Sequence, residues 1–111
     1  MLYKFKSKVT GDVIMLQPNG QRVLEIIGKH SDAEPSIKGI LLPEQMPEAL
    51  AALRQAVALE EAQHKEAIAK ALAEKLPPPR FEPVSLRQRT QPFIEMIGQC
   101  LKDKEAITWG V

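Results

Sequence analysis

The chain has 111 residues, of which 44% are hydrophobic and 26% are charged, and its formal net charge is +1. This near balance of charge argues against a dedicated nucleic-acid binder, because contacts to phosphates need a cationic excess. The longest apolar runs, 13–16 and 49–53, fall far short of the roughly 20 residues that span a bilayer, so we expect no membrane segment.

The first 28 residues predict two strands and a short helix. Residues 2–9 alternate apolar or small side chains with lysines, which is typical of a half-buried strand. Residues 13–16 are apolar and offer a possible second strand, because Pro18 suits an irregular or extended segment better than a helix interior. Asn19 is the expected N-cap of a helix over 19–28, which ends at a glycine.

The middle of the chain predicts a surface loop, a strand and a long helix. The loop covers 29–36, and the short apolar run 38–42 favours a central strand. A helix over 46–75 follows, with a clear apolar stripe in its first four turns. That stripe weakens further along, so we expect the segment at about 62–83 to be less firmly anchored than the rest of the domain.

The last third predicts a connector and a second long helix. Residues 77–83 are rich in proline and indicate an extended connector, too short to separate two domains. Ser85 and Gln88 have capping-box spacing, which places the start of a helix over 85–104. Pro92 lies inside that helix and is expected to kink it or to restart it.

A final apolar segment at 106–110 completes the set of elements and predicts one more strand. We therefore expect a single α+β domain over residues 1–111, with a small, mainly antiparallel sheet of three or four strands packed with three helices. The order of the strands does not follow from the sequence.

Few residues suggest chemistry. The sequence contains no phosphate-binding glycine loop, no HExxH, no CxxC and no nucleophile elbow, so we predict no catalytic residue, metal or cofactor. His30, Asp32 and Glu34 alternate within the loop and are better explained as a solvated turn than as metal ligands. His64 on a helix surface and Cys100 on an apolar helix face support only a third-ranked hypothesis, an enzyme that uses one of these side chains.

Two arginines stand at the start of the last helix. Arg87 and Arg89 occupy its first turn and a half, where positive charge opposes the helix dipole. One explanation is a carboxylate elsewhere in the chain. The alternative is an anion bound by Ser85, Arg87, Arg89 and free backbone N–H groups.

Three lysines and one tryptophan are candidates for contacts with partners. Lys4, Lys6 and Lys8 share one face of the first strand, as a solvated or edge-protecting row or as an anion contact. The aromatic residues of that strand lie on the opposite pleat, which weakens a nucleic-acid hypothesis. Trp109 is explained either by burial of the terminal strand or by a partner-binding hot spot.

Several short motifs resemble one uncharacterised family. They read MLYKFKSK with GDVIML, then VLEIIGK, KGI with LPEQMP, VSLRQR with PFIEMI, and a terminal WGV. In this combination the chain resembles the proteobacterial family known as domain of unknown function 1840, over nearly its whole length except about 62–83. The resemblance implies a stand-alone bacterial protein with no established activity, cofactor or partner.

The leading functional hypothesis is a non-enzymatic interaction module that acts by self-association or by binding another protein. The apolar side chains Ile68, Leu72 and Leu76 in the weakly patterned segment need a cover, which a partner could supply. Cys100 is the only cysteine and no signal peptide is evident, so we expect a cytoplasmic location. The alternative is a module that binds a small anionic ligand at the start of the last helix.

Overall fold

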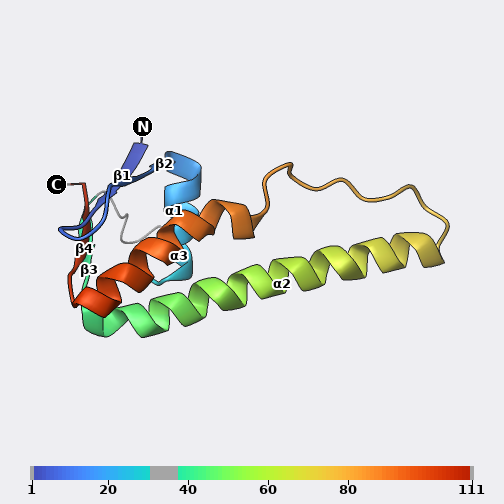
Figure 1. Ribbon diagram of the computed structural model, residues 1–111. Helices are drawn as coiled ribbons and strands as arrows, with labels where there is room; N and C mark the ends of the chain where they lie inside the picture. The colour runs from blue at the N-terminus through green and yellow to red at the C-terminus, as the bar shows by residue number, and fades with distance from the viewer. Residues whose placement is uncertain (1, 31–37, 111) are drawn as a thin grey trace.

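The computed structural model describes residues 2–30 and 38–110, so most of the predicted loop at 29–36, including Asp32 and Glu34, lies outside the described residues. Its elements follow the order β1 (Leu2–Lys6), β2 (Val13–Leu16), α1 (Gln17–Ile26), β3 (Gly39–Leu41), the 3-10 turn η1 (Pro43–Gln45), α2 (Met46–Ala73), α3 (Leu86–Asp103) and β4 (Ile107–Trp109). This is the expected α+β fold, in which the helices lie on one side of the sheet (Figure 1).

The sheet brings the two ends of the chain together. Its strand order is β2-β1-β4-β3 and every neighbouring pair is antiparallel. Phe5 of β1 pairs with Val13 on one side and with Trp109 on the other. The first and last strands therefore form the centre of the sheet, and β2 and β3 form its edges. The central position predicted for the strand at 38–42 is wrong, because β4 pairs with β1 and leaves β3 only one neighbour among the described strands.

The core lies between the sheet and the helices and is built around Phe5. The Phe5 ring centroid lies 4.6 Å from that of Phe93 on α3 and 5.8 Å from that of Trp109 on β4. Trp109 also lies over Gly39, where an added Cβ would come within 2.6 Å of the indole ring. Residue 39 must therefore be a glycine for the tryptophan to be buried beside β3.

β1 is shorter than the strand expected over 2–9. The Ser7 hydroxyl accepts a hydrogen bond from the Val9 N–H at 3.3 Å, which turns the chain after Lys6. The last part of the alternating pattern therefore belongs to a turn.

α1 begins at Gln17, two residues before the expected start, and Asn19 is not its N-cap. Pro18 occupies the first turn, where its missing N–H costs no intrahelical hydrogen bond. Pro18 was expected outside the helix, since proline is unfavourable in a helix interior, but this reason does not apply to the first turn. Asn19 is thereby free to use its side chain elsewhere.

α3 continues through Pro92, so the expectation of a restarted helix is wrong. The proline removes one backbone hydrogen bond, to the carbonyl of Gln88. Both Pro92 and Gln88 are exposed, and solvent can satisfy that carbonyl without a break in the helix.

α2 extends well beyond the sheet and the other helices (Figure 1). With α2 included, the principal extents of the molecule are 52 × 28 × 25 Å. The helix ends where Lys75 adopts a left-handed conformation and the Leu76 N–H donates to the Ala71 carbonyl at 2.8 Å. The chain then returns in an extended form to α3. We call residues 62–76 of α2 and its cap, together with the returning connector 77–84, the arm.

None of the helices in residues 2–30 and 38–110 combines the length and the apolarity that crossing a membrane requires.

Candidate functional site

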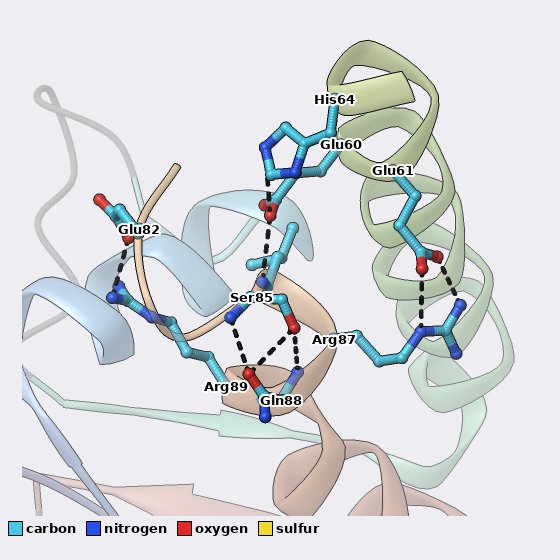
Figure 2. Close-up of polar contacts among 9 residues, drawn as sticks. Glu60, Glu61, His64, Glu82, Ser85, Arg87, Gln88 and Arg89 are labelled. Carbon is cyan, nitrogen blue, oxygen red and sulfur yellow. Dashed lines mark hydrogen bonds and ion pairs between the residues drawn. The ribbon is translucent and has the colours of Figure 1, made fainter. Parts of the chain in front are cut away.

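The start of α3 is fixed by the capping box that the sequence predicts. The Ser85 Oγ accepts a hydrogen bond from the Gln88 N–H at 3.2 Å, and the Ser85 N–H donates to Gln88 Oε1 at 3.0 Å (Figure 2). Two backbone N–H groups at the helix end are thus satisfied within the chain. This places the next turn of α3, with its two arginines, between α1 and α2.

Glu60 of α2 joins the arm to α3. Its Oε1 accepts a hydrogen bond from the Leu86 N–H at 3.3 Å and lies 3.7 Å from His64 Nε2 (Figure 2). The His64 ring stacks on Phe81 of the connector, with centroids 3.8 Å apart and an angle of 12° between the rings. α2, the connector and α3 therefore meet at one junction.

Arg87 points from α3 toward α2 and forms a bidentate ion pair with Glu61. Its Nε donates to Glu61 Oε2 at 3.3 Å and its Nη2 to Glu61 Oε1 at 2.5 Å (Figure 2). Hydrogen bonding from Arg87 lowers the pKa of the Glu61 carboxyl, and the same pair raises the pKa of the Arg87 guanidinium. Both side chains are exposed, so solvent screens this interaction.

Arg89 points the other way, toward α1. Its Nη1 donates to Asn19 Oδ1 at 2.8 Å, and its Nη2 lies 2.8 Å from Glu82 Oε2 of the connector. Its Nε is buried and has no hydrogen-bond partner among the described residues. Both arginines thus have the carboxylate neighbours that the first of our two explanations requires.

A cleft of about 510 Å³ opens beside Arg89. It lies between the start of α1, the middle of α2, the connector and the start of α3. Its lining residues are Pro18, Asn19, Arg22, Val23, Glu60, His64, Phe81, Glu82, Leu86 and Arg89. This volume is typical of pockets that hold small organic molecules.

The residues predicted to bind an anion, Ser85, Arg87 and Arg89, are neighbours at the start of α3, but their polar groups do not converge. Ser85 is used by the capping box, and the two guanidinium groups contact different helices. Asn19 and Glu61 could not be identified as partners from local patterns, because Asn19 is 70 residues from Arg89, and Glu61 is 26 residues from Arg87.

The apolar side chains of the arm remain largely exposed. Ile68, Leu72 and Leu76 have 45%, 74% and 56% of their surface accessible. They are therefore available to a partner.

The remaining candidates lie around the sheet. Lys4 lies 3.7 Å from Asp12, and Lys4 and Lys6 alternate with the buried side chains of β1. Lys8 is exposed in the turn that follows. Trp109 is 1% exposed and packs inside the core.

Cys100 is buried, and its thiol donates to Ser7 Oγ at 3.1 Å. Within residues 2–30 and 38–110, no three His, Cys, Asp or Glu side chains are grouped as metal ligands.

Comparison with known proteins identifies a family and no activity. No curated protein and no solved structure has significant similarity to the chain. One family model matches residues 1–109, which is almost the whole sequence. The chain belongs to the family described as Domain of unknown function (DUF1840).

Proposed function

We propose that the protein is a non-enzymatic interaction module of the bacterial cytoplasm that self-associates through its arm. The observation that supports this most directly is the exposure of the arm's apolar side chains, led by Leu72 at 74%. Burial of apolar surface is the main driving force for protein association, and each such side chain contributes when it is covered. The buried, single Cys100 is consistent with a reducing compartment.

A second copy of the chain is the partner that we favour. The formal net charge of +1 leaves little repulsion between copies. The arm also carries acidic and basic residues close together, at Lys65, Glu66, Lys70 and Glu74, so that two arms can pair opposite charges. Isolated, the arm would leave three aliphatic side chains in water.

The test is sedimentation velocity of the full-length protein across the micromolar range. We expect the wild type to form dimers and the double variant Ile68→Gln with Leu72→Gln to sediment as a monomer. The matched control is Leu59→Gln, since Leu59 is 58% exposed on the same helix but lies on the side opposite Ile68. Circular dichroism verifies that each variant is folded.

A wild type that stays monomeric over this range overturns the proposal. Dimers that persist in the arm variant but dissociate in Leu59→Gln overturn the assignment to this face of the arm.

A further inference from the structure

The two arginines at the start of α3 differ in whether Nε and Nη2 of the guanidinium group both have a partner. Nε and Nη2 of a guanidinium lie on one edge and can hold a carboxylate with two parallel hydrogen bonds. Arg87 uses this edge completely, because both atoms donate to Glu61. Arg89 uses only half of it: Nη2 contacts Glu82, while Nε is buried without a partner among the described residues.

A buried N–H group without a hydrogen-bond acceptor lowers the stability of the fold. An acceptor that reaches the Arg89 Nε–H would remove this cost. Asn19 already holds Nη1 at 2.8 Å, which fixes the orientation of the guanidinium from the α1 side. Glu82, the present occupant, is 74% exposed on the connector. Its side chain can turn into solvent, whereas Arg89 is held in place.

The charges around the cleft fit a single negative charge on a ligand. Arg22 and Arg89 are the cations that line it, and Glu60 and Glu82 are the carboxylates. Glu60 is engaged by the Leu86 N–H and His64, and Arg22 has no carboxylate within ion-pair distance among the described residues. When Glu82 turns outward, two arginines and one carboxylate, Glu60, remain in the lining, and these three groups have a net charge of +1.

The rest of the cleft is apolar or aromatic. Val23 and Leu86 are buried residues that line it, and Phe81, whose ring stacks on His64, also lines it and is 39% exposed. Such a surface suits the hydrocarbon or aromatic part of a small molecule.

We propose that this cleft binds a small organic monocarboxylate, whose carboxylate replaces Glu82 on Nε and Nη2 of Arg89 and whose apolar part packs near Phe81. The site differs from the anion site expected from Ser85, Arg87 and Arg89, because only Arg89 is shared. It does not depend on self-association of the arm. Glu82 acts as an internal competitor for the ligand.

The experiment titrates the full-length, ¹⁵N-labelled protein with benzoate and follows the Nε–H signals of the arginine side chains by NMR. The signal of Arg89 is assigned by its loss in Arg89→Lys. Acetate supplies a carboxylate without an apolar part, and inorganic phosphate supplies an anion of different shape and charge. The variants are Glu82→Gln, which removes the competitor, and Glu61→Gln, which removes the corresponding ion pair on the other side of α3.

We expect saturable benzoate binding that is stronger in Glu82→Gln than in the wild type and unchanged in Glu61→Gln. In Arg89→Lys, where the Nε–H signal of Arg22 in the same cleft reports binding, we expect an affinity at least about tenfold weaker. Acetate and phosphate should bind more weakly than benzoate. Since Glu82 and Glu61 are exposed, their variants will fold, and the comparison between them remains decisive even if Arg89→Lys is unstable.

The proposal is overturned if benzoate causes no saturable shift of the Arg89 Nε–H signal in Glu82→Gln. It is also overturned if Glu61→Gln and Glu82→Gln change the affinity equally, or if phosphate binds as well as benzoate.

Discussion

His64 and Phe81 lie ring on ring across the junction between α2 and the connector, with centroids 3.8 Å apart. Both residues belong to a stretch whose weak apolar pattern gave no reason to expect a fixed contact. The stacked pair, together with the hydrogen bond from Leu86 to Glu60, places the end of the connector beside α2. The connector is thereby positioned to present Glu82 to Arg89.

Replacing His64 with alanine should expose the connector to protease. Arg80 precedes Phe81 and provides a trypsin site next to the stacked ring. An aromatic pair contributes about 0.5–1.5 kcal/mol, so its loss should speed cleavage after Arg80 roughly two- to tenfold. The measurement is limited trypsin digestion followed by mass spectrometry.

Gln63→Ala is the matched control, since Gln63 is an exposed neighbour on the same helix. Equal rates of cleavage after Arg80 in the two variants would show that the stacked pair does not hold the connector.

Removal of the Ser85 hydroxyl should destabilise the protein through the start of α3. Ser85→Ala loses the acceptor for the Gln88 N–H, and loss of such a cap typically costs about 1 kcal/mol in the free energy of unfolding. Urea denaturation measures this difference. Ser85→Thr keeps the hydroxyl and should retain most of the stability, so an equal loss in both variants would argue against the hydrogen bond as the cause.

Local signals in the sequence predicted local structure well. The alternation around Tyr3 and Phe5 identified β1, and the spacing of Ser85 and Gln88 identified the start of α3, because neighbouring residues decide these features. The pairing of β1 with β4 could not be predicted in this way. It depends on the packing of the whole chain around Phe5 and Trp109.

The same distinction applies to the candidate site. The position of Arg89 against the helix dipole indicated that a partner was needed. One partner of Arg89 is Asn19, and the sequence pattern had predicted Asn19 as the N-cap of a helix instead. Only the earlier start of α1 released the Asn19 side chain to contact Arg89.

The Glu61–Arg87 pair should make a pH-dependent contribution to stability. The pKa of Glu61 is lower in the folded protein than its ordinary value of 4.5, because Arg87 hydrogen-bonds to the charged form. The contribution is therefore fully present above the unfolded-state pKa and is lost as the pH falls through the folded-state pKa. Wild type and Glu61→Gln should differ in stability at pH 7 and converge in acid.

The same pair predicts a result for NMR titration of the Glu61 carboxyl. Arg87→Gln should raise its pKa toward the ordinary value, whereas Lys102→Gln, a change in the last turn of α3, should leave it unaltered. An unchanged pKa in Arg87→Gln would show that the ion pair is absent in solution.

The close approach of Trp109 to Gly39 predicts opposite effects of alanine at two glycines. In Gly39→Ala the new Cβ would lie 2.6 Å from the indole ring, and Trp109 is fully enclosed and cannot move aside freely. Overpacking of this kind costs about 1–3 kcal/mol in the free energy of unfolding.

In Gly98→Ala the new Cβ meets nothing within 4 Å. Gly98 is an exposed position within α3, so its replacement by alanine should stabilise the protein by about 0.5–1 kcal/mol. Urea denaturation monitored by the fluorescence of Trp109, the single tryptophan, measures both values. If Gly39→Ala were as stable as the wild type, Trp109 would not pack over β3 in the way described.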